Sequence, residues 1–231
     1  MVIRTDSELI QVKGVNMSED KKRALEILRK LDKAYPDAPK TYLMFSNPFE
    51  MTIATILSAR ATDAGVNKVT PELFGKYPDP KSLAKANAED VAMIIKPCGA
   101  YNRKTSYIIE TARMIDADFG GTIPKTMEAL VTFPGVSRKT ANVVLQVVFG
   151  LAEGVIVDTH IMRVTVRLGF SKHDKKADKI EKDLITLLPK DKWIDYARLI
   201  GAHGRRTCKS SRPRCSECVI SNLCPSSELA D

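Results

Sequence analysis

Helical periodicity constrains the fold of this chain more than any other feature of its sequence. Apolar residues recur three and four positions apart, which places them along one face of an α-helix. The clearest segments are residues 24–35, 108–119, 180–187 and 193–200. Runs of β-branched residues, such as 155–157, are short and lie between helical segments. The sequence therefore predicts an all-α protein of about ten helices, with helix starts at Ser18, at Asn47 and near Asn102.

The charge balance favours a polyanionic partner. The chain has 36 Lys and Arg against 28 Asp and Glu, a net charge of +8, and 44% hydrophobic residues, as in ordinary globular proteins. No apolar run reaches the roughly 18 residues of a bilayer span, and the N-terminus lacks a signal-peptide pattern. We expect an intracellular protein, in the cytoplasm or nucleoid, with no membrane partner. Residues 1–17 show no clear period and are interpreted as an N-terminal arm.

Four of the five cysteines lie close together near the C-terminus. Cys208, Cys215, Cys218 and Cys224 are separated by six, two and five residues. Without an export signal, such crowding favours metal or cluster ligation over disulfides. Zinc is the general expectation, but zinc sites usually pair two short knuckles, whereas an iron–sulfur cluster accepts four unevenly spaced cysteines. The chemistry alone leaves both zinc and an iron–sulfur cluster open. In either case we expect the metal centre to have a structural role, holding the C-terminal tail in place.

Five cations lie around these cysteines: Arg205, Arg206, Lys209, Arg212 and Arg214. A solvated charge run is one interpretation. Held on a rigid metal-bound loop, the same cations would suit contacts with nucleic-acid phosphates.

A Pro-Gly turn separates two helical patterns in the middle of the chain. Pro134, Gly135 and Val136 follow a short apolar segment, 127–133, and precede a helix expected over about residues 137–149. Glycine allows close backbone approach, and the free amides of the second helix point outward. Such a helix–hairpin–helix can bind a phosphate without reading any base.

Lys139 lies among the first residues of that second helix. The positive end of the helix dipole disfavours an ammonium group there and favours the nucleophilic free amine; a surface phosphate contact is the alternative. Asp158 follows the apolar segment 155–157 and precedes the next helix, so it suits an N-cap. Near a basic cleft its carboxylate could also stabilise positive charge developing on a sugar. We interpret His160 as a packing or capping partner.

Taken together, these segments resemble the endonuclease III family of helix–hairpin–helix DNA glycosylases. The resemblance rests on FPGVSRKTANVV at 133–144, VDTHIMRV at 157–164 and the cysteine spacing, with LSARATD at 57–63 and GAYNRK at 99–104 in the family's order. It covers roughly residues 20–225. It implies a two-lobed all-α fold with a helical bundle domain over 46–171. A terminal-helix and iron–sulfur domain, 18–45 and 172–231, would hold a [4Fe-4S] cluster on the four C-terminal cysteines.

The resemblance also implies the reaction. A monomeric enzyme would flip an oxidised pyrimidine out of damaged double-stranded DNA. Lys139 would attack the sugar C1′, expel the base and form a Schiff base, with assistance from Asp158, and β-elimination would then nick the strand. This is a bifunctional glycosylase and abasic-site lyase in base excision repair. The alternatives are a related glycosylase for uracil, mismatched thymine or oxidised purine, and a non-catalytic DNA-binding module.

Two further sets of residues correspond to DNA contacts in the family. The hairpin supplies Pro134, Gly135, Val136 and Ser137, and the loops supply Arg60, Ala100, Tyr101 and Asn102. Arg60 stands where the family commonly has glutamine, and Ala100 where it commonly has a leucine wedge. Arg60 can hydrogen-bond an orphaned base, whereas Ala100 is too small to wedge well. These departures are the reason for the alternative lesion ranges. Ser137 replaces the usual glycine and can cap the following helix.

Overall fold

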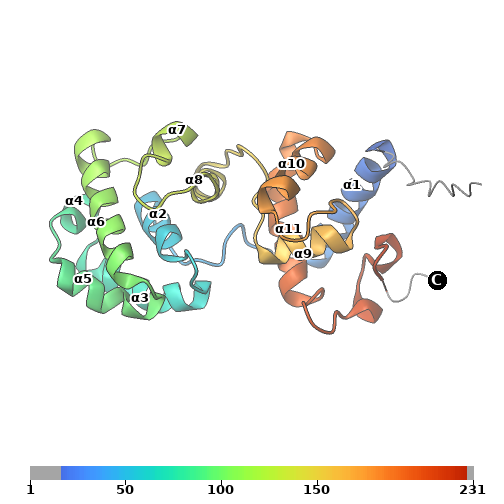
Figure 1. Ribbon diagram of the computed structural model, residues 1–231, viewed down its shortest axis with the longest axis horizontal. Coiled ribbons are helices and arrows are strands. Elements are labelled where there is room, and N and C mark those ends of the chain that lie inside the picture. The colour runs from blue at the N-terminus through green and yellow to red at the C-terminus, as the bar shows by residue number, and fades with distance from the viewer. Residues whose placement is uncertain (1–16, 228–231) are drawn as a thin grey trace, which may run out of the picture.

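The computed structural model describes residues 17–227, which form eleven α-helices and no strand (Figure 1). The helices are α1 (Met17–Ala34), α2 (Pro48–Leu57), α3 (Asp63–Lys76), α4 (Pro80–Ala84), α5 (Ala88–Ile95), α6 (Tyr101–Asp118), α7 (Met127–Leu130), α8 (Arg138–Val144), α9 (Thr159–Arg167), α10 (Ala177–Leu187) and α11 (Trp193–Arg206). The expected all-α class is confirmed. The predicted N-terminal arm lies outside the described residues, apart from Met17, where α1 begins.

Local signals explain several helix boundaries. Asn47 caps α2 through its Oδ1, which accepts from the Glu50 amide at 2.9 Å, and Pro48 is the first helical residue. The predicted starts at Ser18 and Asn47 therefore lie within one residue of the observed ones. Helix α6 begins at Tyr101, and the residue before it, Ala100, has a left-handed backbone and provides no side-chain cap.

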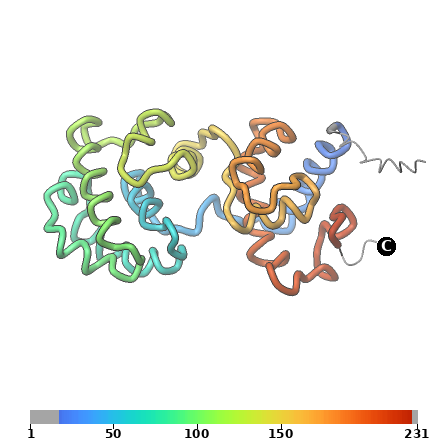
Figure 2. The backbone as a smooth tube through the Cα atoms, in the orientation of Figure 1, coloured from blue at the N-terminus to red at the C-terminus, as the bar shows by residue number. Residues whose placement is uncertain are grey.

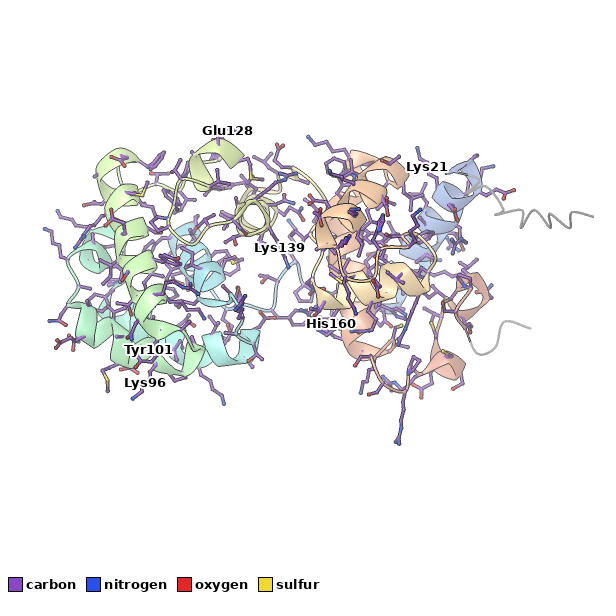
Figure 3. The ribbon with its side chains drawn as sticks, viewed as in Figure 1. Lys21, Lys96, Tyr101, Glu128, Lys139 and His160 are labelled. Carbon is purple, nitrogen blue, oxygen red and sulfur yellow. The ribbon has the colours of Figure 1, made fainter. Side chains whose placement is uncertain are left out.

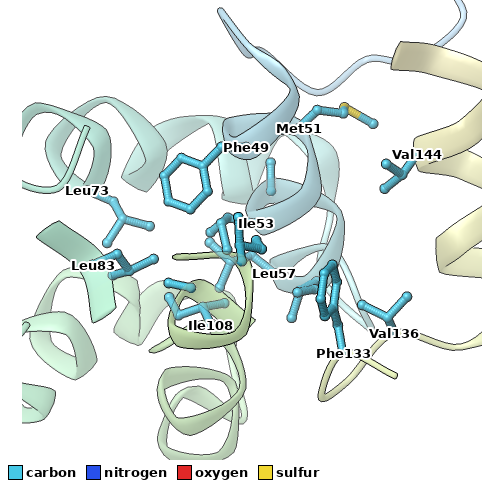
Figure 4. Close-up of a cluster of buried hydrophobic side chains, with 14 of the residues drawn as sticks. Phe49, Met51, Ile53, Leu57, Leu73, Leu83, Ile108, Phe133, Val136 and Val144 are labelled. Atoms are coloured by element: carbon cyan, nitrogen blue, oxygen red, sulfur yellow. The ribbon is translucent and has the colours of Figure 1, made fainter. Parts of the chain in front are cut away.

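The helices form two lobes, each around its own hydrophobic core (Figures 1 and 2). Helices α2 to α8 make the first lobe, whose core includes Ile53, Leu73, Ile108 and Phe133 (Figure 4). Helices α1, α9, α10 and α11 make the second lobe, together with the C-terminal loop. The chain passes between the lobes twice, through residues 35–47 and residues 150–158. Both connections therefore border the space between the lobes.

The position of α9 differs from the domain boundary expected from the sequence. Its apolar residues Ile161, Val164 and Leu168 pack into the second core, together with Val155 and Val157 just before the helix. The change of core therefore falls after Phe149 and before Val155, earlier in the chain than the expected boundary at residue 171. The reason is long-range packing, because α9 buries its apolar stripe against α11 and α10 rather than against the preceding hairpin. No helix of residues 17–227 is long and apolar enough to cross a membrane.

Candidate active site

A cavity of about 180 Å³ lies between the two lobes, and both Lys139 and Asp158 line it. Thr55 and Val143 contribute to its wall from the first lobe, and Arg205 contributes from the second. Figure 3 shows Lys139 in the space between the lobes. Two further hollows adjoin this cavity: one of about 620 Å³ that shares Asp158 and Arg205 with it, and one of about 500 Å³ that shares Lys139.

The hairpin presents Lys139 at the start of α8, where its side chain is exposed. The turn closes through a hydrogen bond from the Val136 amide to the Phe133 carbonyl at 3.0 Å. Gly135 has φ +77°, and a Cβ at this position would lie 2.5 Å from Cδ2 of Tyr107, so only glycine fits. Ser137 caps α8, because its side-chain oxygen accepts a hydrogen bond from the Thr140 amide at 3.2 Å. This is the capping role expected of the serine that replaces the family's usual glycine.

Asp158 is half-buried, and its two carboxylate oxygens have different partners. Oδ1 accepts from the Ile161 amide at 2.8 Å, which caps α9. Oδ2 accepts from Nη2 of Arg205 at 3.2 Å. The N-cap bond orients the carboxylate, and the ion pair holds its second oxygen within the cleft.

Arg205 lies inside the cleft between two carboxylates. Besides its contact with Asp158, its Nη2 is 3.7 Å from Oδ2 of Asp63, which begins α3 on the other lobe. Its guanidinium carbon lies 4.5 Å from the centre of the Tyr42 ring. Asp63 and Tyr42 were not singled out in the sequence, because nothing in their local spacing indicates a contact with residue 205.

The other predicted phosphate contacts divide into paired and unpaired cations. Arg206 makes a bidentate contact with Asp37, at 2.7 and 2.9 Å, and Arg214 lies 3.0 Å from Glu217. Lys209 and Arg212 are exposed and have no ion pair within residues 17–227. These two side chains are therefore the ones most available to an external anion.

Three polar side chains of the α8 segment hold the connection that leads to Asp158. Arg138 donates to the Glu153 carbonyl at 2.8 Å. Buried Asn142 donates to the Gly154 carbonyl at 3.0 Å and accepts from the Glu153 amide at 3.1 Å, and Gln146 donates to the same Gly154 carbonyl at 2.7 Å. These bonds link the element that carries Lys139 to the one that carries Asp158. The signal in the sequence was polar residues four positions apart on an otherwise apolar helix.

His160 lies against neighbouring cations beside the cleft. Its Nδ1 is 3.4 Å from Nη2 of Arg163, and burial together with nearby Arg205 lowers the pKa of the imidazole. Both observations agree with the interpretation of His160 as a packing partner.

The four C-terminal cysteines line a single cavity of about 260 Å³ in the second lobe, beside Val164, Leu168 and Ile220. None of them forms a disulfide. Within residues 17–227, no three Cys, His, Asp or Glu side chains are placed to hold a single metal ion. Four thiols around one cavity form a donor set that fits an iron–sulfur cluster, which cysteine thiolates ligate.

Charged and polar groups surround this cysteine cavity. Arg167 donates to Sγ of Cys208 at 3.2 Å, and Arg163 donates to the Cys208 carbonyl at 2.9 Å. Nε2 of His203 lies 3.8 Å from Sγ of Cys218, and burial lowers the pKa of His203 to about 4, which keeps the imidazole neutral at pH 7. Burial also raises the pKa of the Cys218 thiol.

The loop residues predicted to contact DNA lie on the first lobe and do not line the cavity with Lys139. Arg60 and Ala100 are exposed and have left-handed backbones, with φ 57° and 47°. Tyr101 is half-buried, and Asn102 is exposed. Figure 3 shows Tyr101 in the lower part of the first lobe and His160 on the side of the second lobe that faces the first.

Comparison with known protein families identifies the class that this fold and cleft define. The family model for HhH-GPD superfamily base excision DNA repair proteins matches residues 53–190, and the chain belongs to this superfamily. Within it, the chain is similar to Endonuclease III. It is 43% identical to Endonuclease III of Synechocystis sp., over 93% of this chain and 97% of that protein. It is 41% identical to Endonuclease III of Escherichia coli K12, over 92% and 99%.

Solved structures agree with this similarity. A non-covalent Endonuclease III–DNA complex matches with a TM-score of 0.82 and 37% identity, covering 90% of this chain and 96% of that one. A trapped Endonuclease III–DNA covalent intermediate matches equally well, with a TM-score of 0.82 and 38% identity, over the same shares of both chains. A thermostable thymine-DNA glycosylase matches with a TM-score of 0.76 and 26% identity, over 91% and 98%. The resemblance inferred from the sequence motifs is therefore confirmed.

Proposed function

We propose that this protein is a bifunctional DNA N-glycosylase and abasic-site lyase that removes oxidised pyrimidines from double-stranded DNA. The observation that carries this proposal is that Lys139 and Asp158, from different lobes, line one cavity. Its similarity to Endonuclease III, at 41–43% identity over more than nine-tenths of the chain, supports the same activity. We also propose that the protein acts as a monomer. The expectation that the protein is intracellular stays a prediction.

In the proposed reaction, the damaged nucleotide leaves the base stack and enters the cleft. The Lys139 amine attacks C1′ of the sugar, so that the C1′–N bond to lysine forms while the bond to the base breaks. The base departs with that electron pair and takes up a proton. Opening of the sugar ring gives a Schiff base, and loss of a proton from C2′ then expels the 3′ phosphate.

Asp158 has a distinct role in this scheme. Its carboxylate stabilises the positive charge that develops on the sugar as the base leaves. The N-cap bond to Ile161 and the ion pair with Arg205 hold it in place before substrate arrives. Preorganised charge of this kind needs no rearrangement during the reaction.

Three surfaces would hold the DNA. The hairpin residues Pro134, Gly135, Val136 and Ser137 offer backbone groups to a phosphate. Lys209 and Arg212, which have no ion pair within the described chain, add charge contacts. Arg60, Ala100, Tyr101 and Asn102 meet the duplex where the nucleotide has left the stack.

The cysteine cavity is proposed to hold a [4Fe-4S] cluster through Cys208, Cys215, Cys218 and Cys224. When bound, the cluster supplies four iron–thiolate links that order the C-terminal loop. The side chains of Arg163 and Arg167 support that loop from α9 through its backbone carbonyls. Iron and sulfide analysis of the purified protein tests this assignment, and a protein that contains one zinc ion and no iron would overturn it.

Borohydride trapping on abasic-site DNA tests the proposed chemistry. Borohydride reduces the Schiff base to a stable adduct, so the native protein should become covalently linked to the DNA. Lys139→Ala should give no adduct, while fluorescence anisotropy shows that it still binds the same duplex. Absence of an adduct with the native protein, under conditions where it binds, would instead favour a DNA-binding module without catalysis.

A second candidate is a glycosylase of the same superfamily with another lesion range. Two observations favour testing it: Arg60 and Ala100 replace the family's usual residues, and the fold is also similar to a thymine-DNA glycosylase. Duplexes that contain thymine glycol, uracil, mismatched thymine or an oxidised purine separate the candidates. Release of mismatched thymine without release of thymine glycol would show that the oxidised-pyrimidine assignment is wrong.

A further inference from the structure

A buried lysine joins the two loops that carry Arg60 and Ala100. Lys104, in the first turns of α6, is only 4% exposed. Its Nζ donates to the Leu57 carbonyl at 2.8 Å and to the Cys98 carbonyl at 2.7 Å. Leu57 ends α2, three residues before Arg60, and Cys98 lies two residues before Ala100. One ammonium group therefore holds both loops at their bases.

An ammonium group in this place is costly to bury. Its two hydrogen-bond partners are neutral carbonyls, and burial lowers the pKa of the amine. A methionine of similar length would fill the space without losing the hydration of a charge. The electronegative C-terminal end of α2, where Leu57 lies, offsets part of that cost. Unlike an apolar side chain, the amine provides directed hydrogen bonds to two separate loops.

The backbone of both loops is held in an unfavourable conformation. Within residues 17–227, the non-glycine residues with positive φ are Arg60, Ala100 and Arg212. Side chains with a Cβ disfavour this left-handed region, so such residues persist only where their surroundings hold them. Two of the three, Arg60 and Ala100, come three and two residues after the carbonyls that Lys104 binds. The Lys104 amide also donates to the Ala100 carbonyl at 3.1 Å, which fixes that loop a second time.

We propose that Lys104 is a positioning residue that sets the separation of the Arg60 and Ala100 loops for nucleotide extrusion. This rests on the proposed function, because it requires the two loops to meet the duplex at the extruded nucleotide. Lys104 lies outside the lining of the cavity that contains Lys139 and Asp158, so its loss leaves the reacting groups in place. Loss of Lys104 should therefore slow the opening of the base pair and not the reaction at C1′.

The test compares Lys104→Met on two substrates that differ in the cost of extrusion. Removing the amine should slow single-turnover excision of a paired thymine glycol about tenfold or more. Borohydride trapping on the same duplex with an abasic site should slow less than about threefold, because an abasic site has no base to unstack. A 2-aminopurine beside the lesion reports extrusion directly, and its fluorescence rise should be delayed in the variant.

A matched control separates positioning from loss of stability. Ile115 is fully buried in the same lobe, about three turns further along α6. Ile115→Ala should lower the melting temperature through a cavity but leave the ratio of the two rates at its native value. Lys104→Gln, which keeps one short donor, serves as the second variant if Lys104→Met is poorly folded at the assay temperature.

The outcomes distinguish this inference from the proposed function. Equal loss on both substrates, or no loss on either, would overturn the positioning role of Lys104. If neither Lys104→Met nor Lys104→Gln folds, the role is also overturned, because Lys104 would then support the whole lobe. A native protein that gives no adduct on abasic DNA contradicts the proposed chemistry itself.

Discussion

Asp158 has a structural role and a proposed chemical role, and its two carboxylate oxygens have different partners. The oxygen that accepts from the Ile161 amide caps α9, and the other faces Arg205 in the cleft. The sequence suggested both tasks from position alone. The structure adds the partner, Arg205, which the sequence placed among the phosphate contacts.

Asparagine and alanine at position 158 should therefore behave differently. Asparagine also caps helices, so Asp158→Asn should keep the free energy of unfolding within about 1 kcal/mol of native, while Asp158→Ala loses about 1 kcal/mol more. Both variants should slow base excision by about a hundredfold or more, because the stabilising charge is gone. Urea unfolding and single-turnover excision check the two effects. An Asp158→Asn variant with native excision rates would contradict the catalytic role.

Gly135 is a residue at which only glycine satisfies the backbone. Its φ is +77°, and an added Cβ would meet the ring of Tyr107. Gly135→Ala should lower the free energy of unfolding by about 1–3 kcal/mol and weaken DNA binding, because the turn can no longer hold its amides in place. Thermal unfolding and fluorescence anisotropy measure these effects.

Gly75 is the matched control for that substitution. It lies inside α3, and an added Cβ would meet nothing within 4 Å. Gly75→Ala should raise the free energy of unfolding by about 0.5–1 kcal/mol, since alanine has less freedom to lose in a helix. If both substitutions were equally harmful, the hairpin argument would fail.

At the scale of elements, α8 and the connection to α9 act as one unit. Asn142 on α8 holds the Glu153 amide and the Gly154 carbonyl, and both bonds lie on the path from Lys139 to Asp158. The hairpin that carries Lys139 and the start of α9 that carries Asp158 are therefore joined by side-chain hydrogen bonds and not only by the chain that connects them.

Removing these bonds should loosen the connection. Asn142→Leu leaves the partly buried Glu153 amide and the buried Gly154 carbonyl without this partner, so the free energy of unfolding should fall by about 1–3 kcal/mol. Hydrogen exchange at Glu153 should accelerate, and excision should slow because Asp158 is no longer held relative to Lys139. Thr186→Val, at an exposed position of α10, is the control, and it should leave exchange at Glu153 unchanged. Unchanged exchange in Asn142→Leu would refute this coupling.

At the scale of the whole molecule, we expect the net charge of +8 to contribute to DNA binding mainly through cations that have no ion-pair partner. Lys209→Ala and Arg212→Ala should each weaken DNA binding and lower the slope of log affinity against log salt by about 1, since each removes one phosphate contact. Arg206→Ala is the matched control, because Asp37 already neutralises that guanidinium. Anisotropy titrations at several salt concentrations measure the slopes. Equal slope changes in all three variants would show that the ion pairs seen here do not limit DNA contact.

The sequence by itself determined the all-α fold class and much of the local structure. Helical spacing and capping residues specify most helices because those signals act over three or four residues. Lys139, Asp158 and the four cysteines were predicted as site residues because each belongs to a short motif that resembles the endonuclease III family, and their roles stay predictions. The Pro-Gly turn likewise marks the hairpin, because its backbone conformation is encoded locally.

Only the tertiary structure decided which distant residues meet. It placed α9 in the second lobe, put Arg205 between Asp158 and Asp63, and buried Lys104 beneath two loops. In the sequence, Arg205 belonged to a group of expected phosphate contacts, and Lys104 was the last residue of the GAYNRK segment. The physical reason is that burial and ion pairing depend on how whole helices pack, and that packing joins residues too far apart in the chain for any local pattern to connect them.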